Sequence, residues 1–247
     1  MPAPEIVING DLDELISHAA DLFVQIARDA IARFDSFAVA LAGGSTPRKL
    51  YSLLSSDDYR SALDWSKAAF FFGDERNVPS DSPESNFRMA NETLLKPLSA
   101  DRSQIHRWRT ELADPDAAAD DYDQTLRRHF DTNARGFDLV LLGLGRDGHT
   151  ASLFPHTRAL HERERCAVAN WIDDLGDHRL TVTVPVINRA SNVVFLVTGV
   201  EKAPSVAQIL HGDFKPEEFP AQLVTPENGP VYWLLDEAAA SQLHYSI

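Results

Sequence analysis

The chain has 247 residues, 44% of them hydrophobic, and its 37 acidic residues outweigh 23 lysines and arginines to give a formal net charge of −14. This length and composition are typical of one globular domain with a core of ordinary size. The acidic balance argues against general affinity for nucleic acid or anionic membranes, although a local basic pocket can still bind a small anion.

Cysteine content and the N-terminal sequence further limit the class of protein and the cell compartment that we expect. Cys166 is the only cysteine, which excludes an internal disulfide and makes a cysteine-based metal cluster implausible. The start, MPAPEIVING, lacks the basic and apolar parts of a secretory signal. No apolar run approaches the ~20 residues of a membrane span. We therefore expect a cytoplasmic protein.

Strand-like and helix-like segments alternate along the chain. Glu5 to Ile8 predicts a short strand, and apolar residues at helical spacing from Leu12 to Ile31 predict an amphipathic helix. Asp11 and Glu14 in front of that helix resemble a capping box. Further strands are expected at Phe37 to Ala42, Ala68 to Phe72, Ile105 to Trp108, Leu139 to Leu142, Leu180 to Val184, Asn192 to Val197 and Val231 to Leu235. Further helices are expected from Ser85, over Pro115 to Phe130, and from Asp236.

This alternation predicts the fold class. Strands that alternate with helices are the mark of a mostly parallel sheet with helices on both faces. We expect a single α/β domain over residues 1–247.

Two glycines, two hydroxyls and a proline follow the second predicted strand, as Gly43, Gly44, Ser45, Thr46 and Pro47. Free backbone N–H groups at the start of a helix form an anion site, and phosphate is a common ligand there. The alternative is an ordinary turn in which Ser45 or Thr46 caps the helix. Two consecutive glycines exceed what a cap needs, which favours phosphate.

Three further polar segments follow predicted strands. Asp74, Glu75 and Arg76 are consecutive charges, which belong at the mouth of a site rather than in a core, unless they form a plain surface loop. Lys202 follows the strand at 192–197; it either contacts an anion or is a solvated surface lysine.

Residues 143–150 form the richest of these segments. Gly143 and Gly145 end a buried strand, and Asp147, His149 and Thr150 then supply an acid, a base and a hydroxyl. The segment is either an active-site loop or a glycine-rich turn with a structural histidine. Because carboxyl ends of parallel strands share one edge, the four segments together predict a site for a phosphorylated small molecule with acid–base chemistry.

Three motifs in fixed order resemble the 6-phosphogluconolactonase family: AGGSTPRKLY at 42–51, GDERNVPSDSPESNFRMANETLL at 73–95 and LLGLGRDGHTASLFP at 141–155. The later NVVFLVTGVEKA at 192–203 agrees with them. The resemblance runs nearly end to end. It implies a Rossmann-like fold and hydrolysis of 6-phosphogluconolactone, the second step of the oxidative pentose phosphate pathway, with no metal or organic cofactor. It also implies a phosphorylated sugar lactone as partner, and we expect a monomer or weak homodimer.

Two other functions compete with this one. Glucosamine-6-phosphate deaminase, of the same superfamily, has a tyrosine where this chain has Arg76 and a glutamate where it has Phe154. A non-catalytic sugar-phosphate sensor would have no use for His149 and would carry a nucleic-acid-binding module, which this chain lacks. Both comparisons favour the lactonase.

The resemblance assigns a role to each part of the site. His149 is the expected general base that activates water, since an imidazole has a reference pKa of about 6.5. Asp147 is expected to orient the imidazole. Arg76 or amides of the glycine loop would stabilise the negative charge on the carbonyl oxygen.

The remaining basic residues are assigned to the phosphate. The loop from Gly43 to Thr46 and Lys202 are expected to hold it, with Arg88 as a possible helper. A metal site built from His149, His156 and His161 is not expected, because their spacing fits no ligand motif.

Overall fold

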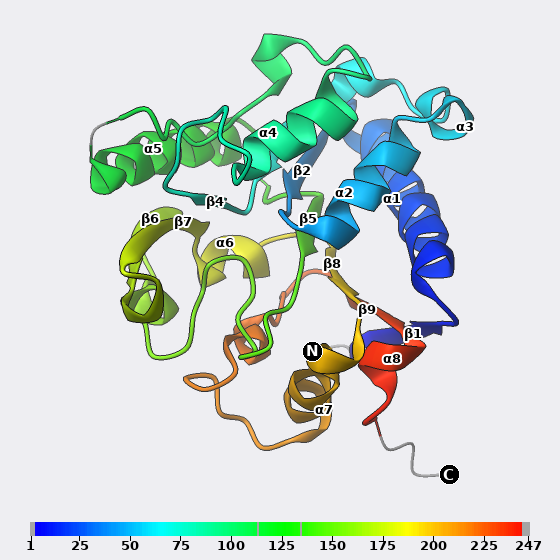
Figure 1. Cartoon of the computed structure of the whole chain (residues 1–247). Coiled ribbons are helices and arrows are strands. Elements are labelled where there is room, and N and C mark those ends of the chain that lie inside the picture. The colour runs from blue at the N-terminus through cyan, green and yellow to red at the C-terminus, as the bar shows by residue number, and fades with distance from the viewer. Residues whose placement is uncertain (1–2, 113, 134, 244–247) are drawn as a thin grey trace.

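Six parallel strands form the central sheet, in the order β1-β9-β8-β5-β2-β3 (Figure 1). The computed structural model describes residues 3–112, 114–133 and 135–243. The strands are β1 (Glu5–Asn9), β2 (Phe37–Leu41), β3 (Ala68–Phe72), β5 (Leu139–Leu142), β8 (Val193–Val197) and β9 (Val231–Asp236). The prediction of a mostly parallel sheet is therefore confirmed.

A second, antiparallel sheet joins β4 (Asp74–Arg76), β7 (Asp177–Val182) and β6 (Ala167–Ile172). The alternative in which Asp74 to Arg76 form a plain surface loop is wrong, because these residues pair with β7. The expectation that the three charges lie outside the core fails for Glu75 alone, which is 2% exposed. The strand expected at 180–184 is β7, which begins earlier and ends at Val182.

Helices pack around the central sheet. They are α1 (Leu12–Phe34), α2 (Ser45–Leu54), α3 (Asp57–Arg60), α4 (Asn86–Ala90), α5 (Pro115–Asn133), α6 (Val184–Asn188), α7 (Ala203–His211) and α8 (Glu237–Ala240). The predicted C-terminal helix is α8, and the positions of the tail after Leu243 lie outside the described residues. None of the helices in the described ranges is long and apolar enough to cross a membrane.

The start of α1 differs in detail from the predicted capping box. The Asp11 carboxylate accepts a hydrogen bond from the backbone N–H of Glu14 at 2.9 Å. The Glu14 carboxylate, however, accepts from the N–H of Gly10 at 2.6 Å rather than from that of Asp11. Only half of the capping box forms as predicted.

The strand expected at Ile105 to Trp108 is also wrong. Among the described residues, a single isolated bridge, between Ile105 and Phe70, joins this segment to the sheet. Side chains hold the segment instead: the Trp108 indole donates to the carbonyl of Phe72 at 3.1 Å and stacks on Tyr122.

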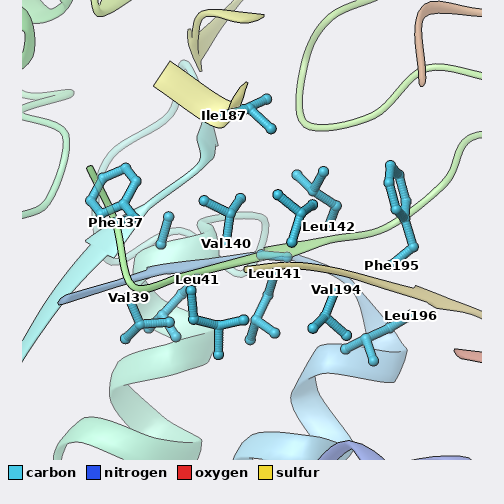
Figure 2. Packing of buried hydrophobic residues seen from close by; sticks show 14 of the residues in the cluster. Val39, Leu41, Phe137, Val140, Leu141, Leu142, Ile187, Val194, Phe195 and Leu196 are labelled. Atoms are coloured by element: carbon cyan, nitrogen blue, oxygen red, sulfur yellow. The ribbon is translucent and has the colours of Figure 1, made fainter. Parts of the chain in front are cut away.

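The core lies on both faces of the central strands, as Figure 2 shows. Val140 and Phe195 point to the face where α6 contributes Ile187, whereas Leu141 and Val194 point to the opposite face. All five side chains are at most 2% exposed. A strand buried on both faces is rigid, so β5 and β8 offer fixed carboxyl ends for the loops that follow them.

Candidate functional site

A cavity of about 310 Å³ lies at the carboxyl ends of the central strands. Loops that follow β2, β3, β5 and β8 all contribute to it. Its wall includes eight of the residues singled out in the sequence: Gly43, Gly44, Asp74, Arg76, Gly143, Gly145, His149 and Lys202.

The start of α2 provides backbone donors beside this cavity. Gly44 is the N-cap residue with φ 105°, a conformation that favours glycine, and no side chain of the described residues caps the helix. The alternative in which Ser45 or Thr46 caps α2 is therefore wrong. The Thr46 hydroxyl is instead 3.0 Å from that of Thr198. The uncapped N–H groups leave the positive end of the helix dipole available to an anion.

Close packing explains why position 43 is a glycine, which the sequence did not reveal. A Cβ at this position would lie 1.9 Å from Oδ1 of Asn86, so a side chain there displaces that amide. Asn86 is the first residue of α4 and also lines the cavity. The two glycines of the loop thus serve different purposes, one conformational and one steric.

The structure separates the two basic residues that were assigned to phosphate. Lys202 lines the cavity, and within the described ranges no carboxylate lies within ion-pair distance of it. Partial burial and, to a lesser extent, nearby Arg146 lower the pKa of Lys202. Arg88 lies outside the cavity: its guanidinium pairs with Glu92 at 2.8 Å and donates to the carbonyl of Asp81.

Asp147 and His149 form a hydrogen-bonded pair. Nδ1 of the imidazole is 2.6 Å from Oδ1 of Asp147. Partial burial raises the pKa of Asp147, but the hydrogen bonds and the charge of His149, with a backbone hydrogen bond, together outweigh it, and the net shift is downward. An ionised Asp147 places the proton of the imidazole on Nδ1 and leaves Nε2 to accept another.

Neighbouring residues hold this pair in place. A Cβ on Gly145 would lie 2.2 Å from Nδ1 of His149 and 2.4 Å from Oδ1 of Asp147, so the pair needs a glycine there. On its other side the imidazole stacks on Phe154, with ring centroids 4.0 Å apart.

Strand alternation explains how β4 divides its three charges. Asp74 and Arg76 both line the cavity. Glu75, between them, is buried, and its carboxylate accepts from the N–H groups of Arg76, Asn86 and Phe87 at 2.7–2.9 Å and from the Ser85 hydroxyl at 3.0 Å. Burial raises the pKa of Glu75. This burial and these hydrogen bonds give Glu75 a structural role rather than a role in the reaction.

Two residues near the cavity escaped the sequence reasoning: Asn86 and Ser152. Asn86 Nδ2 and Ser152 Oγ both donate to the Asp74 carboxylate, at 3.2 and 2.8 Å. Both are 2% exposed. A buried polar residue inside a functional motif was the available signal, since such groups need a partner.

The histidines considered for a metal site pair with different carboxylates. His161 pairs with Glu217 at 3.3 Å, whereas His149 pairs with Asp147. In the part of the chain that the structure describes, no group of three or more His, Cys, Asp or Glu is arranged to hold a metal ion.

The fold and the cavity define the class: this is a Rossmann-like α/β protein with a donor-rich cavity at the carboxyl edge of its parallel sheet. A 6-phosphogluconolactonase from Synechocystis sp. is 41% identical over 245 residues, 98% of each chain. The enzyme of the same name from Nostoc sp. is 39% identical over 236 residues, 94% of this chain and 95% of the other. The solved structure of 6-phosphogluconolactonase from Trypanosoma cruzi superposes with a TM-score of 0.87 at 30% identity, covering 98% of this chain and 97% of that one.

A profile of the family described as glucosamine-6-phosphate isomerases/6-phosphogluconolactonase matches residues 10–233. The chain belongs to this family.

Proposed function

We propose that the chain is a 6-phosphogluconolactonase, which hydrolyses 6-phospho-D-glucono-1,5-lactone to 6-phosphogluconate in the pentose phosphate pathway. The supporting observation is a single cavity lined by the imidazole of His149, whose Nδ1 pairs with Asp147 behind it, and by an uncapped helix start beside Lys202. The first suits proton transfer from water, and the second suits a phosphate. The relatives of the same name support this choice within the family.

In the proposed reaction, Nε2 of His149 takes a proton from water as the water oxygen bonds to the lactone carbonyl carbon. The carbonyl oxygen gains negative charge, which Arg76 or backbone N–H groups of the glycine loops stabilise. The ring C–O bond then breaks as the carbonyl re-forms, and His149 returns the proton to the leaving oxygen. Asp147 stabilises the imidazolium between these steps. The α2 start and Lys202 hold the 6-phosphate throughout.

The surroundings of the imidazole disfavour the deaminase. Phe154, at the position where the deaminase pattern has a glutamate, stacks on the ring of His149 and cannot exchange protons. A non-catalytic sensor is disfavoured too, because it has no need for the Asp147–His149 pair.

The deciding experiment compares two substrates. Offered freshly made 6-phosphogluconolactone, the protein is expected to accelerate acid formation above the spontaneous rate. Offered glucosamine 6-phosphate, it is expected to release no ammonia. Ammonia release without lactone hydrolysis would overturn the proposal.

The setting of the enzyme is also proposed. We expect it to act in the cytoplasm, as a monomer or weak homodimer, with no nucleic-acid partner. The net charge of −14 supports the last point. Light scattering at micromolar concentration, with and without product, measures the mass.

A further inference from the structure

Asp74 is an unexpected residue in a cavity built for an anion. It is the only carboxylate among the described residues that line the cavity, where Arg76, Lys202 and the α2 start are all positive or hydrogen-donating. A carboxylate close to a phosphate site repels the ligand. Its presence there needs a compensating interaction.

Two buried side chains fix the orientation of the Asp74 carboxylate. Nδ2 of Asn86 donates to Oδ1 at 3.2 Å and to the Asp74 backbone carbonyl at 3.0 Å. The Ser152 hydroxyl donates to Oδ2 at 2.8 Å. Asn86 and Ser152 come from different segments of the chain, so the carboxylate is held from two directions.

The donors are themselves anchored. The backbone N–H of Asn86 donates to buried Glu75 at 2.7 Å. The backbone N–H of Ser152 donates to the hydroxyl of Thr181 on β7 at 3.2 Å. A carboxylate oriented before the ligand arrives binds donors at a low entropic cost.

The carboxylate keeps unused acceptor capacity. An ionised carboxylate has about four lone-pair sites, and Asn86 and Ser152 occupy two of them. Within the described ranges no cationic side chain forms an ion pair with Asp74. The remaining sites on this cavity-lining residue therefore suit O–H donors supplied by a ligand.

From this arrangement we propose that Asp74 accepts a hydrogen bond from a hydroxyl of the sugar ring and selects polyhydroxylated substrates over other phosphate compounds. The inference rests on the proposed function, which supplies a ligand that carries both a phosphate and hydroxyls. It makes Asp74 a specificity residue, while His149 remains the base.

The test uses Asp74→Asn with two probes, 6-phosphogluconate and inorganic phosphate, titrated calorimetrically. Hydrogen bonds to charged groups are strong enough that 6-phosphogluconate is expected to bind about 10- to 100-fold more weakly. Inorganic phosphate is expected to bind as well as before or more tightly, because a repelling charge is gone. Asp81→Asn is the matched control: Asp81 is exposed, belongs to the same segment and lies outside the cavity. It is expected to leave both affinities unchanged.

Other outcomes would overturn the inference. Equal losses for both probes would mean that Asp74 only supports the fold of the cavity. Unchanged binding of 6-phosphogluconate would mean that it contacts no hydroxyl. A large decrease in kcat with unchanged 6-phosphogluconate binding would mean that Asp74 acts as a general acid or base instead. Failure of the proposed function is distinct, since the wild type would then neither hydrolyse the lactone nor bind 6-phosphogluconate.

Discussion

His149 is the residue on which the proposed chemistry depends. Asp147 holds its Nδ1 and Phe154 supports its ring, so Nε2 is the nitrogen free to act. General-base contributions are typically ~10²–10⁴-fold, and His149→Asn is expected to lower kcat by a factor in that range. KM is expected to change little, because the phosphate site lies on other loops. Steady-state kinetics, with the spontaneous rate subtracted, measure both constants.

A surface histidine serves as the control for this variant. His161→Asn removes an exposed imidazole that pairs with Glu217 and is expected to keep the wild-type kcat. A folded, product-binding His149→Asn enzyme with near-normal kcat would show that the base lies elsewhere.

Lys202 and Arg88 form a second pair for comparison, because only Lys202 lines the cavity. A charged hydrogen bond contributes about 1.5–3 kcal/mol, so Lys202→Ala is expected to raise KM for the phosphorylated lactone about 10- to 100-fold. For unphosphorylated gluconolactone, Lys202→Ala is expected to keep the wild-type kcat and KM. Arg88→Ala is expected to keep the wild-type constants for both substrates. Equal losses on the two lactones would remove Lys202 from the phosphate site.

The sequence located those residues that follow directly from a buried strand. Gly43, Arg76, His149 and Lys202 lie in the segments that follow four parallel strands, and parallel topology brings such segments to one edge. It could not locate Asn86 and Ser152, whose roles arise from contacts with Asp74 made 12 and 78 positions apart in the chain. A side chain's rotamer is also invisible in a motif.

Among the elements, β4 contributes most to the site for its length. It has three residues, and their alternation sends Asp74 and Arg76 to the cavity while Glu75 turns inward. The sequence placed all three charges at the mouth of a site because consecutive charges rarely enter a core, which holds for Asp74 and Arg76 but not for Glu75. Four hydrogen bonds from residues 76 and 85–87 satisfy the buried carboxylate, which has no cationic partner among the residues that the structure describes.

This arrangement predicts that Glu75 contributes to stability. In Glu75→Gln an amide N–H₂ faces donors in place of a carboxylate oxygen, and a buried donor without an acceptor costs about 1–3 kcal/mol. Urea unfolding is expected to show a loss of that size. Glu84→Gln, at an exposed site nearby, is expected to be neutral. An unchanged midpoint for Glu75→Gln would mean that the 85–87 segment is held by other contacts.

At the scale of the whole molecule, the response to acid depends on where charges are buried. His106 and His129 lie against Phe71, with ring centroids 4.3 and 4.7 Å from it, and 6.4 Å from each other. Burial lowers the pKa of His129 to about 4, and His106 and Arg135 add to the shift. Burial and Arg128 lower the pKa of His106. The folded state therefore favours neutral imidazoles at both positions.

The sign of the resulting pH dependence follows from proton linkage. Unfolded histidines have a pKa of about 6.5, so below that pH the unfolded state binds more protons than the folded state. The free energy of unfolding is expected to be flat above neutral pH and to fall as the pH drops from about 6.5 toward 4. Allowing for partial exposure, His129 accounts for about 1–2 kcal/mol of the loss.

His129→Gln separates this effect from other acid titrations, because most carboxylates stay ionised above about pH 5. Urea unfolding is measured at several pH values between about 7 and 5, a range set by the same reference pKa values. The free energy of unfolding is expected to depend less steeply on pH in the variant than in the wild type. His211→Gln, which removes an exposed histidine, is expected to keep the wild-type slope. The slope rather than the absolute stability is decisive, since glutamine also changes the packing against Phe71. Equal slopes in all three proteins would show that His129 takes up its proton in the folded state as readily as in the unfolded chain.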